Sequence, residues 1–204
     1  GIDGALLAWI TAFLSNRQHC TRICNSYSTY AKIRSGIIQG SCLGPLLFVV
    51  FINDIVDVFN APVKCKLYAH DAKLYSTIMS DADCCNLQVN LDKLFEWSSN
   101  WQLLISHHKC CVMNVCRSKA NVTNNDRAFS YKLETYSLNT VGSVSDLGVT
   151  VDSRLNFSDH IEHITRRAHQ RANLILRCFL SRRTESFVSA FKTYVRPILE
   201  FNSS

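Results

Sequence analysis

The sequence predicts an α+β fold in which strand-forming segments come first and an all-helical segment closes the chain. Two observations carry this expectation. Short β-prone runs occur between residues 20 and 151, and apolar residues recur at helical spacing from Ser158 onwards. The composition agrees with a folded chain, because 47% of the residues are apolar, the formal net charge is +6 and there are three prolines.

The 204 residues suffice for one large domain or two small ones. The longest purely apolar run, Leu46 to Ile52, is far shorter than the roughly 20 residues that span a bilayer. Asp3 stands where a secretory signal would be basic. Ten cysteines occur without a pair of CxxC motifs, which favours reduced thiols over a disulfide framework or a structural zinc site. We therefore expect an intracellular protein that is neither secreted nor bound to a membrane.

The first part of the chain predicts a helix, a strand pair and a second helix. Residues 2–14 place apolar side chains on one helical face, and residues 20–34 predict two strands broken around Asn25–Ser28. A glycine-punctuated loop over 36–44 leads to Pro45, which suits the first turn of a helix over about 45–59. Because that helix is apolar nearly all round, we expect it in the core.

The second part predicts a hairpin followed by mixed elements and two helices. Two β-prone runs around a polar tip predict the hairpin over residues 65–75. Asp81 or Asp83 caps the next expected helix, which runs to about Ser98. Strands and turns are expected over 101–116 and 130–151, then a helix capped at Ser158, and a last helix over roughly 184–200 that is interrupted near Pro197. The residues expected to face inwards from the helix over 158–180 are Ile161, Ile164, Ala168, Ala172, Ile175 and Phe179.

Positive charge is concentrated at the C-terminal end. Residues 154–204 hold nine Lys or Arg against four acids, which supplies most of the net charge, whereas residues 64–153 hold nine of each sign. A basic helical segment suggests an anionic partner, of which nucleic acid is the commonest.

Four stretches stand in a fixed order along the chain. Residues 36–48 read GIIQGSCLGPLLF, and residues 67–75 read LYAHDAKLY. Trp97 and Trp101 are followed by His-Lys-Cys at 108–110, and the last stretch begins with DLGV at 146–149 and ends with VRPILE at 195–200. Together these stretches resemble the reverse transcriptases of non-LTR (LINE, jockey-type) retrotransposons over nearly the whole chain.

The resemblance implies a partial right-hand polymerase fold. Residues 1–153 would form a partial palm, a β-sheet with packed helices, and residues 154–204 a truncated, thumb-like helical segment. The fingers and an upstream strand with a further catalytic Asp would belong to an N-terminal portion of the parent polypeptide, since the chain begins with Gly1. The implied reaction is RNA-templated DNA synthesis by two-metal phosphoryl transfer. Its ligands would be Mg²⁺, an RNA template, a DNA primer and deoxynucleotides.

The resemblance also assigns roles to individual residues. Asp71 would be a metal-binding carboxylate. Lys109 would protonate the leaving pyrophosphate as a general acid, or would be a solvated surface lysine. Gln39, Gly40, Ser41 and Tyr68 would shape the substrate and template pocket. Leu147 and Gly148 would form the turn that grips the primer. Arg166, Arg167 and Arg171 would follow the phosphate backbone of the bound duplex, or would form only a solvated face of their helix.

The sharpest departure from the family pattern lies at position 70. His70 stands where the family has the first Asp of the catalytic pair, and imidazole nitrogen suits Zn, Cu or Ni better than Mg. Alternatively, His70 merely occupies a tight turn, where His tolerates unusual backbone angles. We expect Mg²⁺ not to be held productively and the polypeptide to be inactive. The other hypothesis is a non-catalytic relic of the domain that binds nucleic acid or protein.

Overall fold

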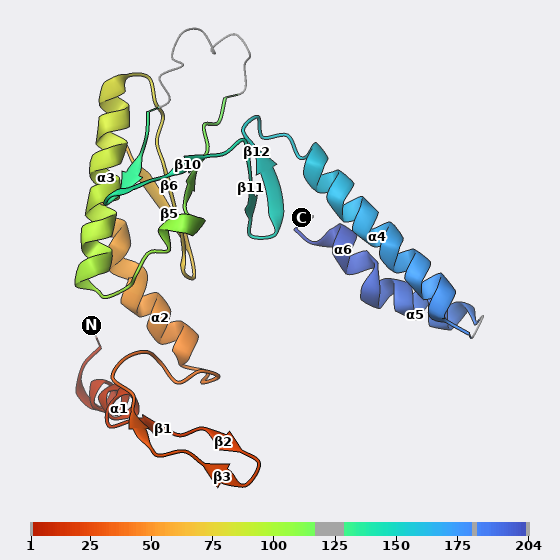
Figure 1. Ribbon diagram of the computed structural model, residues 1–204, viewed down its shortest axis with the longest axis horizontal. Helices are drawn as coiled ribbons and strands as arrows, with labels where there is room; N and C mark the ends of the chain where they lie inside the picture. The colour runs from red at the N-terminus through yellow and green to blue at the C-terminus, as the bar shows by residue number, and fades with distance from the viewer. Residues whose placement is uncertain (1, 117–128, 181–182, 203–204) are drawn as a thin grey trace. The chain divides into compact units, whose positions relative to one another are not determined.

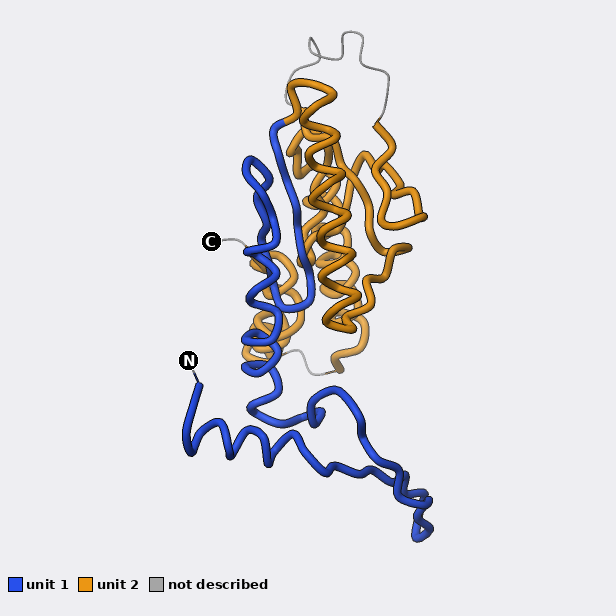
Figure 2. The backbone as a smooth tube through the Cα atoms, turned by 90° about the vertical axis from the view of Figure 1, so that its left-hand side faces the viewer, with its two compact units in different colours: residues 1–77 blue, residues 78–204 orange. Residues whose placement is uncertain are grey.

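The computed structural model describes residues 2–116, 129–180 and 183–202, and its chain divides into two compact units. Unit 1 comprises residues 1–77 and unit 2 residues 78–204 (Figure 2). The palm–thumb boundary expected after residue 153 rests on the family resemblance and stays a prediction.

Unit 1 begins with helix α1, Gly4–Leu14, followed by two short strand pairs (Figure 1). Strand β1, Gln18–His19, pairs antiparallel with β4, Ala31–Lys32. Strand β2, Arg22–Ile23, pairs with β3, Ser26–Tyr27. The strand pair over 20–34 is therefore found, but its turn lies at residues 24–25, before most of the expected break.

Helix α2, Gly44–Ile52, starts as expected at the Gly-Pro step and continues as a 3₁₀ helix over Asn53–Val58. The expectation that it lies in the core is wrong. Leu46 and Val50 are 61% and 53% exposed, and Ile52 is the buried residue of α2. Apolar residues lie all round this helix. The buried apolar residues of unit 1 are Ile52, Ile55 and Val63, so the core lies at the end of α2 and in the segment after it, and most of the helix surface stays uncovered.

The predicted hairpin is present. Strand β5, Lys64–Tyr68, pairs antiparallel with β6, Asp71–Tyr75, and the ladder runs from Lys64 opposite Tyr75 to Tyr68 opposite Asp71. Residues 69 and 70 form the two-residue turn. The alternating burial of β5 follows from the strand period of two, since Cys65 and Leu67 are half-buried while their neighbours are exposed.

Unit 2 is organised by helix α3, Asp81–Asn100. The helix packs against strand β8, Lys132–Leu133, which pairs with β9, Tyr136–Ser137. Gln88 joins the two elements, because its side chain accepts the Lys132 N–H at 2.9 Å and donates to the Lys132 carbonyl at 2.9 Å. Buried residues at this junction include Cys84, Asn90, Leu94, Trp97, Tyr131 and Leu133.

The start of α3 differs from the prediction. Ser80 is the N-cap residue, and Asp83 is the third residue of the helix rather than its cap. The Asp83 carboxylate accepts hydrogen bonds from the Met79 N–H, the Ser80 N–H and the Ser80 hydroxyl, at 2.8–2.9 Å. A Ser followed three residues later by an acid is a helix-start pattern, and it satisfies backbone donors that the helix itself cannot pair.

The segment after α3 contains a 3₁₀ turn and a parallel strand pair. The turn spans His107–Lys109, and strand β7, Cys111–Val112, runs parallel to β10, Asn139–Thr140. A second hairpin follows, made of β11, Ser143–Asp146, and β12, Val149–Asp152.

Three helices complete unit 2: α4, Ser158–Cys178, α5, Thr184–Tyr194, and α6, Arg196–Glu200 (Figure 1). They pack on one another, with Ala168, Ala190 and Val195 buried. The cap expected at Ser158 is wrong, because the Asn156 side-chain oxygen accepts the Ser158 hydroxyl at 2.9 Å and Phe157 is the N-cap residue. Ile161 is 57% exposed rather than inward-facing.

The mixed α+β class is confirmed. Instead of one palm sheet, the described residues form separate two-stranded sheets. Among those same residues, no helix combines the length and apolar character that a membrane crossing requires.

Candidate functional site

The tip of the β5–β6 hairpin carries the residues expected to do the chemistry. Tyr68 and Asp71 are the last pair of the ladder, and His70 lies between them in the turn. All three side chains are exposed. The residue with a positive φ is Ala69, at 51°, and not His70. The turn therefore does not require the backbone tolerance of His, and that explanation for His70 is not supported.

The donor set of this tip does not fit a pair of Mg²⁺ ions. Mg²⁺ prefers oxygen ligands in octahedral geometry, and the tip offers the Asp71 carboxylate beside the His70 imidazole. Elsewhere in residues 2–116, 129–180 and 183–202, no group of three or more His, Cys, Asp or Glu side chains is placed to hold a metal.

The loop over residues 36–44 holds the three residues expected to shape the substrate pocket. Gln39 and Gly40 are exposed and Ser41 is half-buried. Gly40 takes a φ of 84°, which glycine adopts without strain. The Ser41 hydroxyl accepts the Gly44 N–H at 3.1 Å, and this bond ties the loop to the first residue of α2.

Sequence reasoning missed the residue that anchors this loop. The Arg17 guanidinium donates through Nη2 to the Gly36 carbonyl at 2.6 Å and through Nε to the Leu14 carbonyl at 2.9 Å. Leu14 is the last residue of α1, so Arg17 connects the end of that helix to the beginning of the loop. The contact joins positions 19 residues apart, which no local sequence pattern reveals.

Lys109 lies in unit 2, in the 3₁₀ turn before β7, and its side chain is exposed. The turn is fixed by the Lys109 N–H, which donates to the Ser106 carbonyl at 2.9 Å. His107 stacks on Tyr136 with ring centroids 3.7 Å apart. Burial raises the pKa of the neighbouring Cys110 thiol above its ordinary value, and the nearby Cys111 adds to the effect. Asp71, which the sequence analysis expected to act in the same site as Lys109, belongs to unit 1.

Leu147 and Gly148 form the turn that was expected at this position. Both have a positive φ, 46° and 85°, and together they connect β11 to β12. The C-terminal residues pack on this turn. A Cβ added to Gly148 would lie 2.8 Å from Cε1 of Phe201, and the Asn202 amide donates to the Leu147 carbonyl at 3.5 Å. Sequence reasoning missed this contact as well.

Helix α4 presents the three arginines expected to bind the nucleic-acid backbone. The side chains of Arg166, Arg167 and Arg171 are exposed. Within the part of the chain that the structure describes, none of the three forms an ion pair. On the packed side of the helix, Ala168 is buried and His160 accepts the Thr150 N–H at 3.3 Å, which connects α4 to β12.

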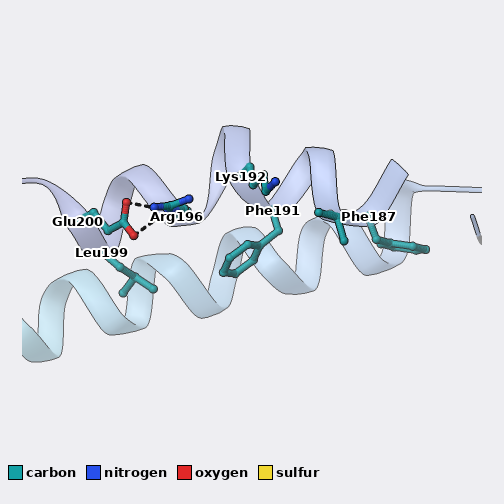
Figure 3. A pocket seen from close by; sticks show the side chains of 7 residues that line it. Phe187, Phe191, Lys192, Arg196, Leu199 and Glu200 are labelled. Atoms are coloured by element: carbon teal, nitrogen blue, oxygen red, sulfur yellow. Dashed lines mark hydrogen bonds and ion pairs between the residues drawn. The ribbon is translucent and has the colours of Figure 1, made fainter. Parts of the chain in front are cut away.

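A groove along α5 and α6 contains none of the expected site residues, although three of its lining residues belong to the VRPILE stretch at 195–200 (Figure 3). Its charged members are Lys192, Arg196 and Glu200. Arg196 forms an ion pair with Glu200 at 2.7 Å, and this hydrogen-bonded carboxylate raises the pKa of Arg196. The apolar side chains that line the groove are Phe187, Val188, Phe191 and Leu199.

Comparison with known proteins identifies the family. The family model described as reverse transcriptase (RNA-dependent DNA polymerase) matches residues 2–151. The chain is 34% identical over 187 residues to the probable RNA-directed DNA polymerase from transposon BS of Drosophila melanogaster, which covers 86% of this chain and 20% of that protein. It is 30% identical over 165 residues to the RNA-directed DNA polymerase from mobile element jockey of the same species, covering 76% of this chain and 17% of that protein.

A jockey polymerase from Drosophila funebris is 27% identical over 206 residues, which cover 94% of this chain and 21% of that protein. The chain thus spans about a fifth of the length of the curated relatives that it matches. No solved structure matches the chain. Because the family model covers most of the chain and the relatives agree with it, the chain belongs to the reverse transcriptase family and is similar to the RNA-directed DNA polymerases of non-LTR retrotransposons.

Proposed function

We propose that the chain is the palm and thumb portion of a non-LTR retrotransposon reverse transcriptase, and that the polypeptide does not catalyse DNA synthesis. Residues 1–153 would be the palm and 154–204 the thumb. The observation that carries the proposal is the hairpin tip. Positions 70 and 71 hold two acids in the family that this chain resembles, whereas here only Asp71 is a carboxylate. The RNA template, DNA primer and deoxynucleotides are then the ligands of the parent enzyme.

The physical reason for the loss of activity is charge. Phosphoryl transfer depends on positioning and on neutralisation of the negative charge that develops on the transferred group. Two bound Mg²⁺ ions supply that neutralisation in polymerases, and carboxylate oxygens hold them. Replacing one carboxylate by His70 removes a negative ligand, and a protonated imidazole would repel a cation.

Primer extension tests the proposal directly. The 204-residue polypeptide is incubated with a DNA primer annealed to an RNA template, all four deoxynucleotides and Mg²⁺, beside an active reverse transcriptase as the positive control. We expect no extended primer. Detectable incorporation by this polypeptide would overturn the proposal.

Metal binding at the tip gives a second test that does not depend on catalysis. Mn²⁺ broadens the NMR signals of nearby residues, so it reports a divalent site at the turn. We expect little broadening in the wild type and strong broadening in His70→Asp. Adding Asp71→Asn to that variant should remove the effect. Equal broadening in wild type and His70→Asp would show that His70 does not weaken the site.

A second candidate function is binding of nucleic acid without chemistry, which the three exposed arginines of α4 favour. Each phosphate contact contributes about 0.9 to the slope of log affinity against log salt for a duplex. Changing Arg166, Arg167 and Arg171 to Ala should therefore lower affinity for an RNA–DNA duplex and reduce the slope by about 2 to 3. A control with the same loss of charge changes Arg22, Lys32 and Arg34, which are exposed residues of unit 1.

If the control variant loses as much affinity as the α4 variant, the binding follows net charge and α4 is not the site. Absence of duplex binding by the wild type excludes this function and leaves protein interaction as the remaining alternative.

A further inference from the structure

Helices α5 and α6 carry a row of apolar side chains that the packing of unit 2 leaves partly uncovered. The row consists of residues four apart, the spacing that aligns side chains along a helix: Phe187, Phe191, Val195 and Leu199. Val195 is buried, whereas Phe191 and Leu199 are 46% and 40% exposed. Figure 3 shows Phe191 and Leu199 projecting to the same side of the two helices, where they line the groove described above.

A second row of groove residues supplies the charge. Its members are again four residues apart: Val188, Lys192, Arg196 and Glu200. The Glu200 carboxylate forms an ion pair with Arg196 at 2.7 Å and offsets its charge. Lys192 belongs to no ion pair within the described part of the chain, so the groove has one positive charge that nothing in the groove balances. A matching occupant is therefore apolar along most of its length and negative at one point.

Helix α1 has this character. Residues 2–14 contain a single charged residue, Asp3, and no residue of the helix is buried. Asp3 is the N-cap residue, but its side chain makes no cap hydrogen bond. Leu6 and Trp9 are 54% and 52% exposed, and Trp9 stacks on Phe13 with ring centroids 6.1 Å apart. Steps of three and four residues place these three apolar side chains and Asp3 on one face of the helix.

The groove and α1 also match in length. A helix of 11 residues is about 16 Å long, and Leu199 comes 12 residues after Phe187, which is about 18 Å of helix. Rows of side chains on one helix pack between the rows of another. With α1 parallel to α5, Asp3 lies towards the Phe187 end, within reach of the flexible side chain of Lys192. One contact between copies then covers two apolar surfaces that each chain leaves exposed.

We propose that helix α1 of a second copy of this chain occupies the groove along α5 and α6, with Asp3 paired to Lys192. Each copy has one α1 and one groove, so two copies donate their α1 helices to each other and form a closed, two-fold symmetric dimer. The inference goes beyond the proposed function, because the contact involves no nucleic acid, nucleotide or metal ion.

Sedimentation velocity of the full chain over about 1 to 100 µM, without nucleic acid, measures the association. We expect a dimer whose fraction rises with concentration. Changing Val188 and Phe191 together to Ser should weaken the dimer at least tenfold, because both side chains line the groove. The matched control changes Leu174 and Leu176 of α4 to Ser, which are 50% and 56% exposed and lie outside the groove. A wild type that is monomeric throughout, or equal losses in the two double variants, would overturn the proposal.

Charge reversal tests the pairing of Asp3 with Lys192. Lys192→Glu and Asp3→Lys each place like charges together, and each should weaken the dimer about tenfold, because the pair occurs twice in it. The variant with both changes has opposite charges again and should recover most of the wild-type affinity. Lys132→Glu, which alters an exposed lysine of β8, is the control and should have no effect. A double variant as weak as the two single variants would contradict the pairing.

A cross-link on the wild-type protein keeps the test valid should a variant fold poorly. Unlabelled copies are mixed with copies that carry heavy nitrogen and are treated with a water-soluble carbodiimide, which joins a carboxylate and an amine in contact as an amide. Mass spectrometry of the digest should show Asp3 linked to Lys192 in peptides of mixed label. Absence of this cross-link, or its presence only between peptides of the same label, would overturn the proposal.

Flotation with phosphatidylcholine vesicles examines a lipid surface as the other apolar occupant. A chain that sediments as a monomer but floats with the vesicles would assign the exposed apolar side chains to lipid and overturn the proposal. None of these assays measures DNA synthesis or duplex binding. Their failure therefore leaves the proposed function unaffected, and detectable primer extension leaves the dimer unaffected.

Discussion

Gly148 combines two requirements that only glycine meets at once. Its φ of 85° is strained for any residue with a side chain, and an added Cβ would lie 2.8 Å from the Phe201 ring. Gly36 offers the matched case, because its φ is 82° and nothing lies within 4 Å of an added Cβ. The two glycines therefore separate backbone strain from steric contact.

We expect Gly36→Ala to lower the free energy of unfolding by about 1 kcal/mol, from strain alone, and Gly148→Ala to lower it by about 1 kcal/mol more, from overpacking. Urea unfolding followed by circular dichroism measures both. Introducing Phe201→Ala should reduce the penalty of Gly148→Ala, and this coupling is the signature of direct contact. Strictly additive effects would show that the ring does not rest on the turn in solution.

Individual residues also mark where sequence reasoning succeeded and failed. The hairpin over residues 65–75 and the turn at Leu147–Gly148 were predicted, because both depend on residues that are neighbours in sequence. The bond from Arg17 to the Gly36 carbonyl and the contact of Phe201 with Gly148 were not, because each joins residues far apart in sequence. Periodicity identifies a face but not the partner that covers it.

Helix α3 shows how a cap is misassigned by one to three residues. Its start was expected at Asp81 or Asp83, but Ser80 is the N-cap and the Asp83 carboxylate reaches back to it. The hydrogen bond from the Met79 N–H, followed by those from Ser80, lowers the pKa of Asp83 below its ordinary value. The stabilising contribution is therefore present above the unfolded pKa of about 3.9 and is lost as pH falls through the lower, folded value.

Asp83→Asn should destabilise the protein at pH 7, and the difference from the wild type should shrink when the pH falls below about 4. Urea unfolding at a series of pH values measures the difference. Asp81→Asn, which changes another carboxylate in the first turn of the same helix, is the control. A difference that stays constant down to the lowest pH would mean that the ionised Asp83 is not what holds the cap.

The presence of each helix and hairpin was easier to predict than the burial of its side chains. Helices α1 to α5 and the β5–β6 hairpin lie close to their expected positions, because hydrophobic period and turn chemistry are local. The expected palm sheet is instead seen as separate two-stranded pairs, and α2 exposes Leu46 and Val50. Both features depend on which elements meet in space, which an apolar pattern leaves open.

For the candidate site as a whole, the resemblance to a family pointed to a reaction, whereas composition and charge did not. Net charge suggested an anionic partner without naming a reaction, whereas the ordered motifs led to a family that the comparisons confirm. The roles of Lys109, Gln39 and the α4 arginines stay predictions. Lys109 and Gln39 were placed by motif matches and the arginines by the basic face of their helix, and Lys109 lies in a different compact unit from Asp71.

The ten cysteines are distributed over both units and report on the packing within each. None of the ten forms a disulfide in the described residues, which include all of them, and they range from exposed Cys24 and Cys178 to buried Cys84. Thiolate is the reactive form, and burial raises the pKa of Cys65 and Cys110, so at a given pH these two carry less thiolate than a thiol of ordinary pKa. Burial likewise raises the pKa of Tyr131, whose hydroxyl contacts Cys84 in the core of unit 2.

Brief alkylation of the native protein with iodoacetamide at pH 7.5, quantified for each cysteine by mass spectrometry, should modify Cys24 and Cys178 first, Cys65 and Cys110 more slowly, and Cys84 last. The rates at Cys65 and Cys110 should still be rising with pH above the ordinary thiol pKa of about 8.5. In urea all ten should react at similar rates, which provides the control. Rapid native modification of Cys84 would show that the packing of α3 against β8 is not maintained in solution.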